Sequence, residues 1–168
     1  LWAFWAAKEA AYKAVSKPYP HATATPRRYS VDLTANGPSA ALDGIVNSPY
    51  GRVWVRIFND ADRVHCIGAY HCTGGINKIC WGLDRIRPHT SDAGRLEADN
   101  ESLRVRQMAA DRISAYLRLE PELIEIKRKK GLRRSTPPEV YVSGRQTKID
   151  ISLSHHGRFG AYAFWAPC

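Results

Sequence analysis

The stretch Trp5-Ala6-Ala7-Lys8-Glu9-Ala10-Ala11-Tyr12-Lys13 lies near the start of the chain and predicts a helix. Residues 1–17 are rich in alanine, the strongest helix former, and contain neither glycine nor proline. Pro18 follows directly and ends this segment. We therefore expect one helix over residues 1–17, around which the first part of the chain is built.

The side chains of this helix divide into two sets by their spacing. Trp5, Glu9 and Lys13 follow one another at intervals of four residues, so they share one face. The remaining surface carries the apolar residues that are expected to contact the core, namely Phe4, Ala7, Ala11, Ala14 and Val15.

Glu9, with Lys8 and Lys13 beside it, has two interpretations. As a functional site, the carboxylate would bind a divalent metal ion and the two lysines would neutralise phosphate oxygens. As ordinary surface, it is a solvated Glu–Lys pair four residues apart, which stabilises a helix by only about 0.2–0.5 kcal/mol. Spacing alone favours the second interpretation.

Strand-like segments follow in the first part of the chain. Alternation is clearest in Arg52–Phe58, where Val and Ile alternate with other residues. The linker over residues 34–51 is rich in turn-forming residues and is expected to be mostly loop, with one short strand. The strands expected here are Tyr29–Leu33, Ala41–Val46, Arg52–Phe58 and Arg63–Tyr70.

Gly74-Gly75 marks a break, after which a second set of elements is expected. Residues 89–98 are polar and predict a loop. A second helix is expected over Asn100–Leu119, with one apolar stripe formed by Leu103, Ala110, Ile113 and Leu117. The strands expected around it are Ile76–Ile86, Glu122–Ile126, Pro138–Val142, Lys148–Ser154 and Arg158–Trp165.

The order of these elements predicts an α+β protein built from a duplicated unit of one helix packed on a small antiparallel sheet. The first half would span residues 1–75 and the second residues 76–168. On this interpretation the first half lacks the strand that opens the second half. The chain also starts without a methionine, so we expect a further piece upstream of Leu1 to carry that strand.

Two motifs, one in each half, resemble those of the 4′-phosphopantetheinyl transferase superfamily. Trp5-x-x-Lys8-Glu9-Ala10-x-x-Lys13 is similar to the central signature of that family. Ile149-Asp150-Ile151-Ser152-Leu153-Ser154-His155, followed by Gly160-Ala161-Tyr162-Ala163-Phe164, is similar to its partner signature. The Lys-Glu-Ala motif precedes Ser-His, which is the order of the holo-acyl-carrier-protein synthase type. The chain length suggests a form with two fused halves, with the site between them.

The resemblance implies a reaction and a set of site residues. Such an enzyme transfers the 4′-phosphopantetheine arm of coenzyme A to a serine of an acyl or peptidyl carrier protein, needs Mg²⁺, and releases 3′,5′-adenosine bisphosphate. By resemblance, Glu9 binds Mg²⁺ and acts as or assists the base, and Lys8 and Lys13 face the phosphates. Ser154 and His155 would contact the 3′-phosphate end of coenzyme A. We add Arg158, which is not part of the family motif, to this last group.

The family's other metal ligand is an aspartate in a Gly-x-Asp strand upstream of the Lys-Glu helix, a position that would lie ahead of Leu1. Gly82-Leu83-Asp84 has this local pattern, but the duplication assigns it to the equivalent strand of the second half. We therefore expect Asp84 to be a solvent-facing aspartate rather than a ligand.

A net charge of +9 favours an anionic partner such as phosphates, an acidic protein or nucleic acid. The basic run Lys127–Arg134 could bind coenzyme phosphates or the acidic surface of a carrier protein, or it could be a solvated loop. No nucleic-acid-binding motif accompanies it, so no specific nucleic-acid partner is expected. The alternative functions are a non-catalytic module that binds coenzyme A or a carrier protein, and a basic protein with non-specific affinity for nucleic acid.

No apolar run approaches the roughly 20 residues that a membrane span needs, and charged residues interrupt the first segment, so we expect neither a membrane partner nor a signal peptide. Four cysteines in 168 residues do not suggest a disulfide scaffold and favour reduced thiols and a cytoplasmic location. Two fused halves favour a monomer, since one chain would supply both sides of the site.

Histidines and cysteines gather at His65-Cys66, His71-Cys72 and Cys80, but their spacing matches no standard zinc site. Alternation along a strand would also send His65 and Cys66 to opposite faces. The same argument separates Ser154 from His155, and no nucleophile elbow is present, so a hydrolytic dyad is not expected. We expect the cysteines to be buried or to lie on an edge strand.

Overall fold

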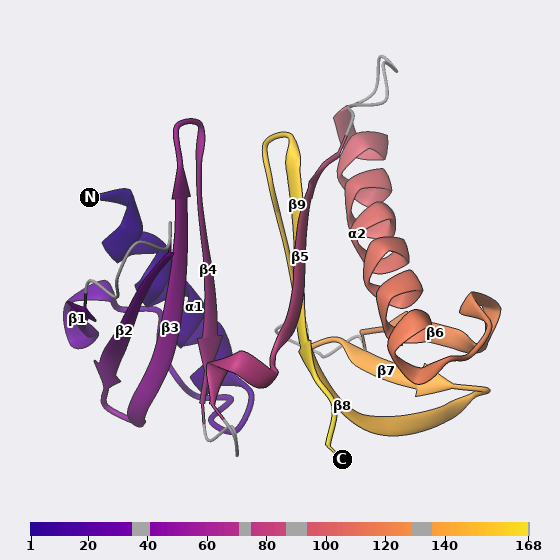
Figure 1. Cartoon of the computed structure of the whole chain (residues 1–168), viewed down its shortest axis with the longest axis horizontal. Coiled ribbons are helices and arrows are strands. Elements are labelled where there is room, and N and C mark those ends of the chain that lie inside the picture. Colours follow the sequence, from indigo (N-terminus) through magenta and orange to yellow (C-terminus); the bar gives the residue numbers. More distant parts are fainter. Residues whose placement is uncertain (35–40, 71–74, 87–93, 129–135, 168) are drawn as a thin grey trace. The chain divides into compact units, whose positions relative to one another are not determined.

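The computed structural model describes residues 1–34, 41–70, 75–86, 94–128 and 136–167, with the side chains of helix residues 94–100 left aside. The chain divides into two compact units, Leu1–Ile79 and Cys80–Cys168. Within the described residues, each unit has one α-helix and one antiparallel sheet (Figure 1). The α+β class predicted from the sequence is therefore confirmed, whereas the origin of the two units as copies of one duplicated unit stays a prediction.

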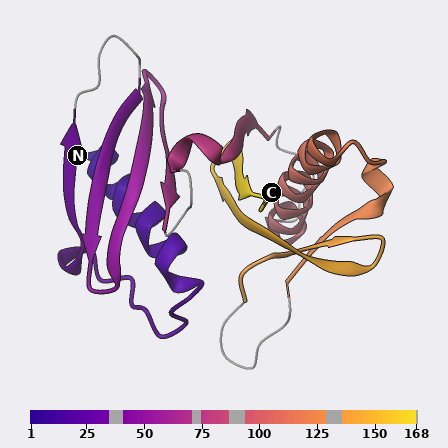
Figure 2. The same cartoon turned by 60° about the horizontal axis from the view of Figure 1, so that its bottom comes forward.

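The first unit is a four-stranded sheet with the helix on one face, as Figure 2 shows. All neighbouring strands are antiparallel and follow the chain in the order β1-β2-β3-β4. Its elements are α1 (Trp2–Ser16), the 3-10 turn η1 (Pro26–Arg28), β1 (Ser30–Thr34), β2 (Ala41–Ser48), β3 (Gly51–Asp60), β4 (Arg63–Ala69) and the 3-10 turn η2 (Ile76–Lys78).

The linker that was predicted to be mostly loop contains more strand than expected. Strand β2 extends to Ser48 and pairs along its whole length with β3 through a tight turn at Pro49-Tyr50. Gly44 lies inside the strand, where a Cβ would stand 2.6 Å from the carbonyl oxygen of Asp32. The glycine therefore permits close approach of β1 and does not break the strand.

Helix α1 packs through a narrow stripe of small residues. The helix packs mainly on β3 and β4, and its buried residues Ala7, Ala11 and Val15 share a core with Val46, Val53, Val55 and Ile57. Phe4, predicted to contact the core, is 47% exposed, so that part of the prediction was wrong. The stripe repeats every four residues, and the position that continues it towards the N-terminus is Ala3, which packs against the core.

Cys66 lies on β4 opposite Ile57, on the face that packs against α1. Burial raises the pKa of its thiol to about 12. Since the thiolate is the reactive form, we expect iodoacetamide at about pH 8 to alkylate Cys66 at least ~100-fold more slowly in the folded protein than in denaturant. Mass spectrometry of the Cys66 peptide measures both rates, and similar rates in the two states would contradict this expectation.

The second unit is a five-stranded antiparallel sheet in the order β5-β9-β8-β7-β6. Its helix packs on β6, β8 and β9, and the core gathers Ala109, Ile113, Ile124, Val140, Ile151 and Phe164. Its elements are β5 (Cys80–Arg85), α2 (Gly94–Leu117), the 3-10 turn η3 (Pro121–Leu123), β6 (Ile124–Lys127), β7 (Glu139–Val142), β8 (Arg145–His156) and β9 (Phe159–Trp165).

Three details of the second set of elements differ from the sequence-based expectation. The strand expected from Ile76 starts at Cys80, because residues 76–78 form the turn η2. Helix α2 begins at Gly94, inside the predicted loop over 89–98, since the residues after Gly94 are mostly good helix formers. Leu103 was expected on the apolar stripe but is 57% exposed. The buried stripe contains Val105 and Ala109, and Leu103, two positions before Val105, lies on the opposite side of the helix.

The two sheets differ by one strand. In the second unit, β5 precedes the helix and pairs with β9. In the described part of the first unit, β4 is an edge strand and pairs only with β3. In the described residues, the first unit thus contains one helix followed by four strands. The second unit begins with a strand, β5, and then also contains one helix followed by four strands.

Candidate functional site

The Lys-Glu motif lies on α1 away from the core. Glu9 Oε1 and Lys13 Nζ form an ion pair of 2.8 Å, and their side chains are 52% and 35% exposed. The helix places them together because residues four apart are neighbours on its surface. By itself this geometry is that of an exposed helical ion pair.

Lys8 is directed to a different partner. Its ammonium group donates a hydrogen bond of 2.9 Å to the carbonyl oxygen of Pro26, the first residue of η1. Two exposed arginines, Arg27 and Arg28, complete this turn. Lys8 therefore ties a basic turn to the helix that carries Glu9, a link between distant segments that the local sequence pattern did not reveal.

The motif offers a divalent cation one carboxylate, that of Glu9. Within the described residues, no three His, Cys, Asp or Glu side chains are grouped so that they could hold a metal ion. Mg²⁺ is commonly bound by one or two carboxylates together with substrate phosphates. Glu9 therefore fits Mg²⁺ only as a partial site, completed by phosphate oxygens of a bound substrate.

Ser154 and His155 lie near the end of β8, where this strand turns into β9. Ser154 pairs with Ala161 and His155 pairs with Gly160. A Cβ on Gly160 would contact Val105 of α2, so Gly160 and its partner His155 occupy the helix side of the sheet. Ser154 therefore projects from the other face, as the alternation argument expected.

On the helix side, His155 meets a carboxylate. Its Nδ1 lies 3.3 Å from Oε2 of Glu101 on α2, and the two side chains are 42% and 29% exposed. This pair holds the imidazole ring against the helix and leaves part of it accessible. Glu101 was not among the predicted site residues, because nothing in its local sequence indicates that it faces a strand residue so distant along the chain.

Arg158 occupies the turn of the β8–β9 hairpin, between Gly157 and Phe159. Gly157 has a positive φ of 54°, which glycine adopts without strain. Arg158 Cζ lies 5.5 Å from the centre of the Phe159 ring, and Arg85 of β5 approaches the same ring at 5.8 Å. Arg85 was missed by the sequence analysis, although it directly follows the Gly82-Leu83-Asp84 pattern.

Asp84 is exposed, and its Oδ1 accepts a hydrogen bond of 2.7 Å from the backbone amide of Arg85. The expectation of a solvent-facing aspartate is thus confirmed. Gly82 has a packing role, because a Cβ there would stand 2.5 Å from the hydroxyl oxygen of Tyr162. The Gly-x-Asp pattern in this strand is therefore accounted for by local packing and capping.

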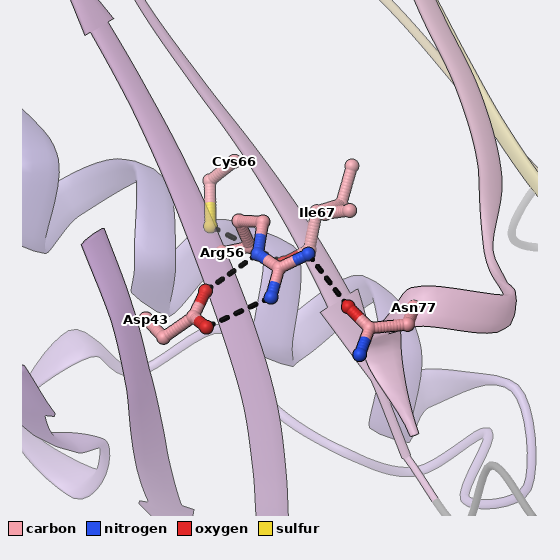
Figure 3. A network of polar contacts seen from close by, with 5 residues as sticks. All are labelled: Asp43, Arg56, Cys66, Ile67 and Asn77. Atoms are coloured by element: carbon pink, nitrogen blue, oxygen red, sulfur yellow. Dashed lines mark hydrogen bonds and ion pairs between the residues drawn. The ribbon is translucent and has the colours of Figure 1, made fainter. Parts of the chain in front are cut away.

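Among the residues drawn in Figure 3, the paired Asp43 and Arg56 lie on the face of the first sheet that is turned away from α1. The Arg56 guanidinium donates to both carboxylate oxygens of Asp43, at 2.6 and 2.8 Å, and to the side-chain oxygen of Asn77 at 2.8 Å. The bond to Asp43 raises the pKa of Arg56 above its usual value. Since Asn77 belongs to η2, the network fastens this turn to β3 and has a structural role.

His65 stacks on Phe58 with ring centres 6.1 Å apart, on the opposite face of the strand from Cys66. Burial, together with the positive charges of Arg63 and Lys13, lowers the pKa of His65 to about 4. The ring is therefore neutral at physiological pH. Of the other members of the His–Cys group, His71 and Cys72 lie outside the described residues, and Cys80 lies on β5 and packs against the core of the second unit.

The predicted site residues belong to both units. Lys8, Glu9 and Lys13 are on α1 of the first unit, and Ser154, His155 and Arg158 are on the β8–β9 hairpin of the second. In the basic run, Lys127 forms an ion pair of 2.7 Å with Glu125 and lies over the ring of Tyr141. Residues 129–134 of this run lie outside the described part of the chain.

No family model, curated protein or solved structure was found to match this chain. Over the parts of the chain that the structure describes, no helix is both long and apolar enough to cross a membrane.

Proposed function

We propose that this protein transfers the 4′-phosphopantetheine arm of coenzyme A to a serine of an acyl or peptidyl carrier protein. The proposal rests on the paired motifs, and the observation that supports it most is where their polar groups lie. Glu9 and Lys13 are on the exposed side of α1, and His155 and Arg158 are at the exposed end of a hairpin. Neither set is used to build a core, so both are accessible to a charged substrate.

The chain's own residues have distinct tasks in this reaction. Lys13, paired with Glu9, and Lys8 at the adjoining basic turn provide positive charge for the pyrophosphate of coenzyme A. The oxygen of the carrier serine attacks the β-phosphorus of coenzyme A. As it does so, the Glu9 carboxylate takes the serine proton or helps another base to take it. His155 and Arg158 bind the 3′-phosphate, which leaves with the 3′,5′-adenosine bisphosphate.

A cofactor is also part of the proposal. Glu9 would hold Mg²⁺ together with phosphate oxygens of coenzyme A, as the single carboxylate of the motif allows. Bound there, the ion would neutralise negative charge on the pyrophosphate.

The experiment is a transfer assay with a fluorescent coenzyme A analogue, Mg²⁺ and purified apo carrier proteins of the fatty-acid, polyketide and nonribosomal-peptide types. We expect covalent labelling of at least one carrier, seen as a fluorescent band, and its loss when the acceptor serine is replaced by alanine. Chelation of Mg²⁺ should also remove it. No labelling of any carrier would contradict the proposal, and calorimetric binding of coenzyme A without labelling would identify a non-catalytic binding module.

A further inference from the structure

The basic turn η1 is held in place from two sides. On one side, Lys8 of α1 donates its hydrogen bond of 2.9 Å to the carbonyl oxygen of Pro26. On the other side, Tyr29 follows the turn directly and is buried in the core of the first unit. The Tyr29 hydroxyl donates a hydrogen bond of 3.2 Å to the carbonyl oxygen of Thr23, which precedes the turn. The backbone of η1 is thus anchored to both the helix and the core.

The two arginines of this turn have guanidinium groups that are available to a partner. Arg27 and Arg28 are exposed. Within the described residues, neither forms an ion pair or a side-chain hydrogen bond. Residues 35–40 and 71–74, the undescribed part of this unit, contain neither aspartate nor glutamate. The turn therefore presents two positive charges that the first unit does not neutralise.

The acidic residues of the first unit are engaged or distant from η1. The Glu9 carboxylate on α1 is held by Lys13. The carboxylates of two strand residues have polar partners of their own, namely Asp32 with Asn47 and Asp43 with Arg56. The remaining acidic residues lie at the turn from β3 to β4, at the opposite end of the sheet from Ser30, and are Asp60 and Asp62. In a protein with a net charge of +9, η1 is thus complementary to an acidic surface.

Exposed aromatic rings adjoin the basic turn through Lys8. Phe4 and Trp5 precede Lys8 by four and three residues, and residues at these spacings are neighbours on a helix surface. Both rings are exposed, as are all of residues 23–28. Aromatic side chains and arginine are enriched at protein–protein interfaces, whereas small ligands are bound in concave sites. The surroundings of η1 therefore favour a protein partner over a small phosphate.

We propose that Arg27 and Arg28 dock an acidic surface of the carrier protein beside the helix that carries Glu9. This inference rests on the proposed function, in which a carrier protein is the second substrate. Lys8 joins η1 to the residue directly before Glu9, so a carrier docked at η1 is held close to the carboxylate that receives the serine proton. Charge pairs of this kind speed association and fix the orientation of the partner.

The test measures steady-state labelling of the apo carrier protein by Arg27→Glu/Arg28→Glu. Reversing both charges replaces attraction by repulsion, so we expect kcat/KM for the carrier to fall at least ~10-fold. The KM for coenzyme A should stay within about twofold of wild type, because the turn does not contact the coenzyme. Arg27→Lys/Arg28→Lys keeps the charges and should retain most of the wild-type kcat/KM.

The second unit supplies a matched control. Arg112→Glu/Arg145→Glu reverses two exposed arginines there and should label the carrier like the wild-type protein. An equal fall of kcat/KM in this control would indicate an effect of net charge and overturn the inference. Circular dichroism of each variant checks folding.

Three other results would also overturn the inference. One is an unchanged kcat/KM for the carrier in Arg27→Glu/Arg28→Glu. Another is a similar rise in the KM for coenzyme A, which would assign the turn to coenzyme phosphates. The third is binding of a single-stranded oligonucleotide, but of no carrier, that the charge reversal abolishes, which would assign the turn to nucleic acid.

Calorimetry of apo carrier binding needs no turnover and separates this inference from the function on which it rests. Labelling together with an unaffected kcat/KM in Arg27→Glu/Arg28→Glu would refute only the docking site. Carrier binding that this variant loses, without labelling by the wild-type protein, would support the docking site and refute the transferase. Neither binding nor labelling of any carrier would refute both.

Discussion

Replacing Glu9 by glutamine is expected to lower the rate of carrier labelling by at least ~100-fold, the usual cost of removing one charged group that stabilises a phosphoryl transition state. Glutamine keeps the length and shape of the side chain but cannot accept a proton or neutralise a cation. Stability should change little, because the ion pair with Lys13 is more than a third exposed on both sides and such pairs contribute about 0.3–0.5 kcal/mol.

The second unit offers a matched control for this substitution. Glu125 forms an ion pair of 2.7 Å with Lys127, and its side chain is 48% exposed, much like that of Glu9. Glu125→Gln removes the same charge from the same kind of surface pair, so labelling by this variant should remain close to wild type. If Glu9→Gln labels the carrier as fast as Glu125→Gln does, Glu9 is only a surface residue and the assignment of the site is wrong.

The sequence predicted helices and strands best where the residues of a short segment determine its backbone conformation. Helix α1 begins and ends within one residue of the expected 1–17, because alanine-rich composition and Pro18 act over a few residues. Strand β2 was expected to end at Val46, because turn-forming residues follow, but contact with β3 through the pairs Asn47–Arg52 and Ser48–Gly51 extends it to Ser48. That contact exists only after the strands pair, so no local pattern could report it.

The candidate site shows the same difference between local features, which were predictable, and tertiary contacts, which were not. Alternation along a strand correctly separated Ser154 from His155, because the period of two is a property of the strand itself. The partners of the site residues were not predictable. The carbonyl of Pro26 for Lys8 and the carboxylate of Glu101 for His155 both come from segments that tertiary packing brings close.

Acid is expected to destabilise the first unit through His65. Its pKa is about 4 in the folded protein and would return to about 6.5 on unfolding. Between these values the unfolded chain binds a proton that the folded chain does not, so stability falls as the pH drops from 6.5 towards 4. The difference between the two pKa values corresponds to roughly 3 kcal/mol at most.

His65→Phe should remove this dependence while keeping an aromatic ring against Phe58. Urea unfolding followed by circular dichroism at pH 7 and at about pH 4.5 gives the free energy of unfolding of each variant. Carboxylates also titrate in this range, but they do so in both proteins, so the difference between wild type and His65→Phe isolates the histidine. We expect wild type to lose about 2 kcal/mol more than the variant.

His21→Phe, which replaces an exposed histidine of the same unit, is the control substitution for the loss of an imidazole ring. An equal acid response in wild type and His65→Phe would show that His65 is protonated in the folded protein. Burial and the charges of Arg63 and Lys13 all disfavour the protonated ring. Protonation of His65 in the folded protein would therefore have to be caused by another group near the ring. An NMR titration midpoint of the His65 ring well above pH 4 would give the same answer directly.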